Sequence, residues 1–194
     1  MLWKEQLLEA IAGKNRGLLA TELDNQTILS AIARLEEYNP TPRPLEALDK
    51  LDGNWRLLFT TSNELLQIDR VPFFQLGQIY QLIRSKTAQI FNIAEVIGVP
   101  YLEGIVSVSA KLDIVSEKRA NVRFERGVLG LQRILGYQSP TQFIALLDSG
   151  KRFPPIDFQI SSDRQQGWLD VTYLDDNLRI GRGNEGNVFV LAKV

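Results

Sequence analysis

The chain has 194 residues, of which 44% are apolar and 23% are charged, and its formal net charge is −1. This length suits a single domain that folds without disulfide or metal staples, and the balanced charge argues against a nucleic-acid partner. The chain contains neither cysteine nor histidine, which excludes a thiolate nucleophile, a Ser-His-Asp triad and a zinc–thiolate site, so we expect no enzyme, no metal and no cofactor.

Residues 1–44 predict a helical segment that packs on the rest of the chain. Leu7, Leu8 and Ile11 share one helical face, and Asp24 is expected to cap a second helix that stops before Asn39. The N-terminal residues show neither the pattern of a signal peptide nor that of a transit peptide. No window approaches the ~18 consecutive apolar residues of a spanning helix, so we expect any membrane contact to be peripheral.

Residues 45–194 predict an antiparallel sheet of about eight strands. Apolar and polar side chains alternate with a period of two, and turn residues separate the segments. The predicted strands cover residues 55–61, 88–96, 106–114, 120–124, 157–161, 168–173, 178–182 and 187–193. No long helices interleave, so the strands should be antiparallel, forming either a sandwich or a closed barrel. The fold class is therefore mainly β with N-terminal helices.

Two apolar stretches do not alternate and fit this scheme less well. One covers residues 71–80, and the other runs from Gly127 to Leu147. Both could pack in the core, and both could be mobile covers over the mouth of a cavity.

Three blocks of sequence resemble the fibrillin, or plastid lipid-associated protein (PAP), domain. They are residues 51–62 (LDGNWRLLFTTS), residues 77–81 (GQIYQ) followed by Asn92, and residues 173–184 (YLDDNLRIGRGN) with residues 188–191 (VFVL). The blocks occur in the order of the family and span most of the chain.

This resemblance implies a lipocalin-like barrel that handles prenylquinones, carotenoids or related apolar lipids at thylakoids or plastid lipid bodies. Plant members carry a transit peptide, so the chain resembles a cyanobacterial-type member, thylakoid-associated or cytoplasmic, or else the mature form of a plastid protein. The family offers no catalytic residues to carry over.

Gly53 and Trp55 resemble the Gly-x-Trp entry of lipocalins, in which a Trp closes one end of the barrel beneath an Arg. Arg179 and Arg182 are the two candidates for that Arg. Strand parity places them on opposite faces, so at most one can meet Trp55, and we expect Arg179 to be the inward one. Trp55 could be a structural plug or could contact a ligand directly.

The expected ligand is an apolar lipid held inside the barrel. We expect ligand contacts from aromatic residues and one Arg, namely Trp55, Phe59, Tyr80, Tyr173 and Arg179. Eight-stranded barrels can be filled by their own side chains or can hold one ligand, and small residues on the predicted inner faces favour a cavity. Tyr173 and the two carboxylates after it could instead form a turn or bind a cation.

Two segments are expected to contact a peripheral membrane surface. Their residues are Phe73 and Phe74, together with the basic residues Lys118, Arg119, Arg123 and Arg126, which could dock on anionic lipid or simply form a solvated strand face. An alternative function is a structural or recruiting protein that coats lipid bodies or docks a lipid-synthesis enzyme without an internal ligand. A third, an enzyme using Asp113 or Glu95, would need two carboxylates facing inward.

Overall fold

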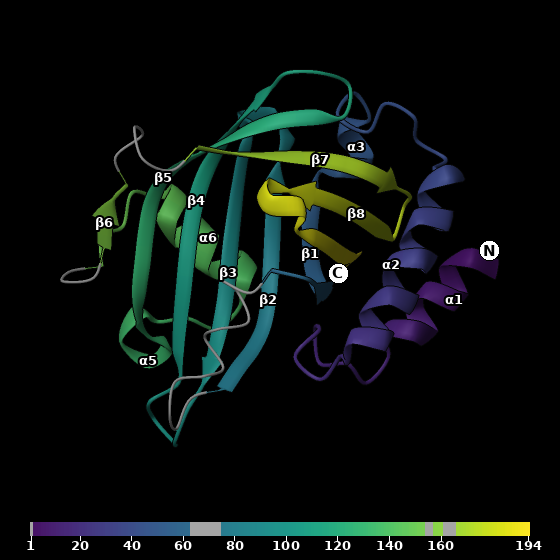
Figure 1. The fold of residues 1–194 in the computed structure, drawn as a ribbon. Coiled ribbons are helices and arrows are strands. Elements are labelled where there is room, and N and C mark those ends of the chain that lie inside the picture. Colours follow the sequence, from purple (N-terminus) through teal and green to yellow (C-terminus); the bar gives the residue numbers. More distant parts are fainter. Residues whose placement is uncertain (1, 63–74, 154–156, 161–165) are drawn as a thin grey trace.

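The computed structural model describes residues 2–62, 75–153, 157–160 and 166–194. Its centre is a closed antiparallel β-barrel, with helices lying against two parts of its outer surface (Figure 1). The strands are β1 (Gly53–Thr60), β2 (Gln75–Arg84), β3 (Gln89–Ile97), β4 (Gly104–Ile114), β5 (Arg119–Leu131), β6 (Asp157–Gln159), β7 (Gln166–Leu174), β8 (Leu178–Gly183) and β9 (Val188–Lys193).

Eight of these strands form the barrel in the order β4-β3-β2-β1-β9-β8-β7-β5, and pairing of β4 with β5 closes it. The short β6 pairs only with the second half of β5. Closure leaves no long unpaired edge. The predicted fold, a lipocalin-like antiparallel barrel of about eight strands with N-terminal helices, is therefore confirmed.

The two apolar stretches that lack alternation contain strands. Part of the first lies in β2, and the second begins in the last residues of β5. Ile79 and Ile83 of β2 point into the barrel, whereas Tyr80 and Leu82 pack against helices outside it. A strand that is covered on both faces has no reason to alternate. Residues 127–131 likewise continue β5, and α5 (Gln132–Leu135) and α6 (Pro140–Asp148) follow.

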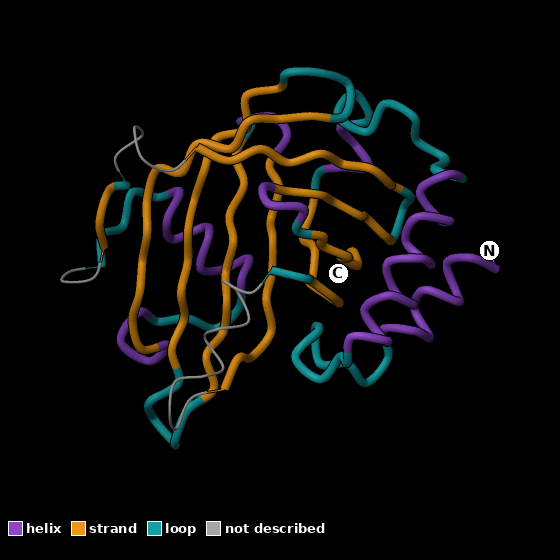
Figure 2. Tube along the Cα trace, viewed as in Figure 1, coloured by secondary structure: helices purple, strands orange, loops and turns teal. Residues whose placement is uncertain are grey.

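The N-terminal helices α1 (Leu2–Ile11) and α2 (Glu22–Glu37) lie side by side against β1, β8 and β9 (Figure 2). Leu7, Ile28 and Ile32 on the helices are fully buried against Ile180 and Val190 of the barrel. These apolar residues recur at helical spacing, so one stripe of each helix faces the sheet.

Helix α2 begins earlier than the sequence suggested. Thr21, not Asp24, is its N-cap, and the Thr21 hydroxyl accepts a hydrogen bond from the Asp24 amide at 3.1 Å. The Asp24 carboxylate accepts in return from the Thr21 amide at 2.9 Å, which completes a capping box. A hydrogen bond from Lys14 and those from Thr21 lower the pKa of Asp24 to about 2.

A second helical layer covers the outer faces of β2 to β5. Phe143 and Ile144 of α6 pack with Phe91, Ile93 and Ile105 of the sheet. The apolar side chains thus form three separate clusters, which are the barrel interior, this second layer, and the cluster under α1 and α2. The second layer covers β2 to β5, whereas the cluster under α1 and α2 covers β1, β8 and β9.

Candidate functional site: the interior of the barrel

The barrel interior is lined by apolar side chains from most of its strands. The buried lining residues are Leu57, Leu76, Ile79, Ile83, Ile90, Ala94, Ala110, Leu112, Ala120, Val122, Val171, Leu174 and Leu191. Leu45 and Leu51, from the segment that includes α3 (Leu48–Leu51), join this cluster together with Trp55. The segment that leads into β1 therefore contributes to the same core as the strands.

Trp55 is fully buried and makes three polar contacts. Its indole N–H donates a hydrogen bond to the Leu51 carbonyl at 3.0 Å. The Arg179 Cζ lies 5.0 Å from the ring centroid, and the Lys193 Nζ lies 5.2 Å from it. A cation over an indole ring contributes about 0.5–2 kcal/mol, so these contacts fix the Trp as well as the two cations.

Gly53 makes room for one of these cations. Its φ is +135°, a conformation that L side chains rarely adopt, and an added Cβ would lie 2.7 Å from the Lys193 Cε. The Lys193 ammonium also donates to the Lys50 carbonyl at 2.8 Å. The Gly-x-Trp motif thus allows β1 to pack closely against the end of β9.

Arg179 is the one fully buried cation among the described residues, with 1% of its surface exposed. Its Nη2 donates to the Gln81 side-chain oxygen, and the Gln81 amide donates in turn to Asn92 Oδ1 at 2.8 Å. Its Nε and Nη1 are buried with no hydrogen-bond partner. Burial lowers the pKa of Arg179 to about 9, because a guanidinium away from water loses its hydration.

Arg182 points out of the barrel, on the opposite face of β8. It forms two hydrogen bonds with the Glu36 carboxylate of α2, at 2.9 and 2.7 Å. The Thr172 hydroxyl donates to the same carboxylate at 2.5 Å. Arg182 therefore joins helix α2 to the barrel and does not take part in the contact with Trp55.

The expected ligand residues do not all lie inside the barrel. Phe59, expected to contact a ligand inside the barrel, packs instead under α1 and α2, on the face opposite to that of Trp55 and Leu57. The pairing with β9 shifts by one residue between Leu57 and Phe59, and such a β-bulge moves the following side chain to the other face.

The two expected tyrosines also lie outside. Tyr173 packs in the cluster under the N-terminal helices, and its hydroxyl donates to Asp175 at 2.8 Å. Asp175 also accepts hydrogen bonds from the Lys4 ammonium at 2.7 Å and from the Leu178 amide at 2.7 Å. The bond to the Leu178 amide is typical of a turn, and the bond from Lys4 connects this turn to α1. Tyr80 packs on the side of α6. Of the expected set, Trp55 and Arg179 face the interior.

The carboxylates considered for catalysis do not face inward either. Glu95 accepts a hydrogen bond from the Tyr137 hydroxyl at 2.7 Å on the outer side, and burial together with this carboxylate raises the pKa of Tyr137. Asp113 is exposed near the end of β4. Within the described ranges, no three acidic residues gather as a metal site, and no helix there is long and apolar enough to cross a membrane.

The basic residues expected to dock on anionic lipid are partly neutralised. Arg119 forms two 2.6 Å hydrogen bonds with Asp170, and its Cζ lies 4.3 Å from the Trp168 ring centroid. Arg126 pairs with Asp157, whose pKa this hydrogen bond lowers. Lys118 is exposed and Arg123 is half-buried. Phe73 and Phe74, the other expected contacts, lie outside the described residues.

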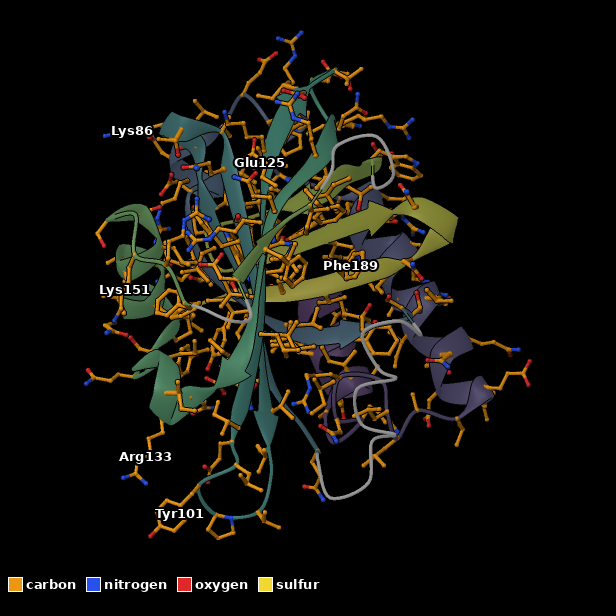
Figure 3. The ribbon with its side chains drawn as sticks, turned by 90° about the vertical axis from the view of Figure 1, so that its left-hand side faces the viewer. Lys86, Tyr101, Glu125, Arg133, Lys151 and Phe189 are labelled. Carbon is orange, nitrogen blue, oxygen red and sulfur yellow. The ribbon has the colours of Figure 1, made fainter. Side chains whose placement is uncertain are left out.

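One end of the barrel carries an apolar surface that the sequence analysis missed. We name it the apolar end and define it by the exposed residues Ile97, Val99, Tyr101, Leu102, Leu129 and Ile134. Tyr101 and Arg133 lie at the same end of the molecule (Figure 3), and the Arg133 Cζ is 5.7 Å from the Tyr101 ring centroid. A signal was present, because Ile97, Val99, Tyr101 and Leu102 lie between the predicted strands 88–96 and 106–114, and Leu129 and Ile134 lie in the apolar stretch from Gly127 to Leu147.

Taken together, an eight-stranded closed barrel with an apolar interior and a Trp–Arg contact at its core defines a lipocalin-like barrel. The PAP_fibrillin family model matches residues 1–192. The chain belongs to this family.

Three similar proteins come from plants. The chain is 34% identical to the chloroplastic light-induced protein of Solanum tuberosum, covering 99% of this chain and 67% of that protein. It is 33% identical to the chromoplast-specific carotenoid-associated protein of Cucumis sativus, covering 98% and 67%. It is 32% identical to the probable plastid-lipid-associated protein 2 of Arabidopsis thaliana, covering 98% and 70%.

Proposed function

We propose that the chain binds an apolar lipid, of the prenylquinone or carotenoid class, inside its barrel and catalyses no reaction. The observation that carries this proposal is the lining of the barrel. It is apolar on nearly all strands. In the described part it is interrupted by a polar ladder, in which Arg179 is buried and Gln81 and Asn92 are half-buried, and by the Lys193 ammonium over Trp55.

The chemistry of such an interior suits a long apolar guest. Removing apolar surface from water stabilises a complex by roughly 25 cal/mol per Å², and a few placed polar groups then orient the guest. Ala94, Ala110 and Ala120 keep the lining side chains short on β3, β4 and β5. We therefore assign the guest's tail to this side of the interior.

The names of the relatives support the same function and a location. One relative is named for carotenoid association and another for plastid lipids, and the names place them in chromoplasts and chloroplasts. We propose that this chain likewise works beside a photosynthetic membrane, at a thylakoid or lipid-body surface.

The fluorescence of Trp55 tests the internal site. The chain has three Trp, and Trp3 and Trp168 both lie outside the barrel. In the variant Trp3→Phe/Trp168→Phe, Trp55 is the only indole left. We expect a prenylquinone to quench its emission saturably, because the quinone and the indole would share the interior.

The control is a quinone with the same ring but no prenyl tail, added to the same variant. It should quench weakly, since Trp55 has 0% of its surface exposed and the tail supplies most of the burial. Absence of saturable quenching by prenylquinones, carotenoids or acyl lipids alike would contradict an internal binding site.

A second function is favoured by the apolar end. Exposed apolar groups that gather at one place on a soluble domain are typical of contact surfaces, and Tyr101 and Ile134 are 72% and 76% exposed. Through this end the protein would coat a lipid body or dock a lipid-synthesis enzyme, with or without an internal guest. Flotation of the protein with lipid vesicles tests this function.

A further inference from the structure

Arg179 carries a positive charge that no described group neutralises. The carboxylates nearest to it in sequence are engaged elsewhere, because Asp175 is bound to Lys4 and Tyr173, and Asp176 is paired with Lys50. Its one hydrogen-bond partner, Gln81, is a neutral amide. A charge that is removed from water without a counter-charge is destabilising, so its retention in an apolar core calls for a further explanation.

The contact with Trp55 does not supply that explanation. The ring lies beneath the guanidinium and interacts with its charge across the ring face. The N–H donors of a guanidinium point outward in its own plane, and they need acceptors at its edge. Nε and Nη1, which together carry three N–H groups, have no acceptor. The Trp55 contact therefore leaves these three buried N–H groups without an acceptor.

The acceptor that best suits these N–H groups is an anion. Two oxygens of one carboxylate can take parallel N–H bonds from Nη2 and either Nε or Nη1, because Nη2 has a second N–H besides the one that Gln81 accepts, and they neutralise the charge at the same time. A neutral carbonyl could accept a hydrogen bond but would leave the charge uncompensated. The groups around Arg179, such as Leu174 and Leu191 on the same barrel face, are apolar and suit the carbon chain behind such a head.

We propose that, besides the neutral lipids named above, the barrel binds a long-chain carboxylate whose head accepts hydrogen bonds from the unpaired N–H groups of Arg179 and whose tail lies along the apolar lining. This inference rests on the proposed internal lipid site and adds to it the chemical class of the head group. Gln81 and Asn92 are then positioning residues, because they hold Arg179 in orientation through Nη2.

The test compares two fluorescent probes that share one tail. cis-Parinaric acid carries the carboxylate, and its methyl ester carries a neutral head of similar shape. We expect the wild-type protein to bind the acid about tenfold more tightly than the ester at pH 8, as is typical of a hydrogen bond to a charged group. Titration of probe fluorescence measures both dissociation constants.

Variants of the two arginines on β8 locate the effect. Arg179→Met should bring the acid and the ester to within about threefold of each other, while Arg182→Met, on the outer face, should keep the preference for the acid. Circular dichroism checks that each variant is folded. If Arg179→Met does not fold, Arg179→Lys replaces it, and it should retain a reduced preference because it keeps the charge without the fork.

The outcomes separate the two proposals. Equal binding of acid and ester by the wild-type protein would overturn the carboxylate assignment and leave the lipid site intact. A preference for the acid that survives in folded Arg179→Met would overturn it as well. Failure of both probes and of the prenylquinone to bind would remove the lipid site itself.

Discussion

Gly53, Trp55 and Lys193 form a small interlocking group at the start of β1. The glycine adopts φ +135°, and this conformation lets the Lys193 side chain pass close to the backbone on its way to the Trp55 ring. The motif that resembles the lipocalin entry therefore has a physical reason in this chain. Its glycine adopts a backbone conformation that other residues rarely adopt. Its Trp donates a hydrogen bond to the Leu51 carbonyl and contacts two cations, Arg179 and Lys193.

We predict that Gly53→Ala lowers the free energy of unfolding by about 2–4 kcal/mol. An L residue is strained at this φ, and the new methyl group would displace Lys193 from Trp55 and from the Lys50 carbonyl. Urea denaturation measures the change. Gly136→Ala is the control, because Gly136 has φ +68° with nothing within 4 Å of its Cβ position, and it should cost about 1 kcal/mol. Equal losses would contradict the role given to Lys193.

Along each strand, side chains alternate between the interior and the outer face, and a β-bulge shifts this alternation by one residue. On β1 the pairing shifts between Leu57 and Phe59, and on β7 it shifts between Val171 and Tyr173. After each shift, an aromatic residue lies under α1 and α2 instead of inside the barrel. The bulges thus transfer two large side chains from the interior to the helix-covered face.

The ion pair between Glu36 of α2 and Arg182 of β8 is expected to stabilise the packing of this helix on the barrel. Glu36→Gln should lower the free energy of unfolding by about 1–2 kcal/mol, because the carboxylate accepts from both Arg182 and Thr172. The adjacent Glu37 is exposed, so Glu37→Gln should change stability by less than about 0.5 kcal/mol. Urea denaturation of the two variants and the wild type provides the comparison. Indistinguishable curves would show that this ion pair does not hold the helix.

For the whole molecule, the two ends of β4 and β5 differ in chemistry. The apolar end includes the turn between β3 and β4, whereas Lys118 lies in the turn between β4 and β5, at the opposite end of the same strands (Figure 1). Arg119 and Arg126 are already paired with carboxylates. If the protein meets a lipid surface, the apolar end is therefore better suited to make the contact than the basic residues.

We predict that vesicle flotation depends on the apolar end and not on anionic lipid. Tyr101→Asp/Ile134→Asp should reduce the floated fraction severalfold, because each change places a charge in the lipid interface. Val115→Asp, an equivalent change at an exposed apolar residue of the opposite turn, should float like the wild type. Binding that requires anionic lipid and is lost in Lys118→Glu/Arg123→Glu would instead assign the contact to the basic residues.

Much of the fold was predictable because it depends on local periodicity. The alternation along β4 fixes which of its residues face inward, and helical spacing identifies α1 and α2. The strand β2 was not predicted, since its two covered faces give no alternation. The start of α2 was misplaced because Thr21 and Asp24 both fit the pattern of a cap.

By itself, the sequence pattern determined about eight alternating antiparallel strands in a sandwich or a barrel, a helical segment before them, and a chemistry without thiolate or imidazole, and the resemblance to the PAP/fibrillin domain implied the barrel. Opposite faces for Arg179 and Arg182 also followed from parity alone. Only the tertiary structure decided that Arg179 lies over Trp55 with two nitrogens lacking an acceptor, that Arg182 pairs with Glu36 of α2, and that Phe59 lies outside the interior. The reason is physical: parity sets relative facing along one strand, whereas bulges, barrel closure and partners far away in sequence decide which face becomes the inside.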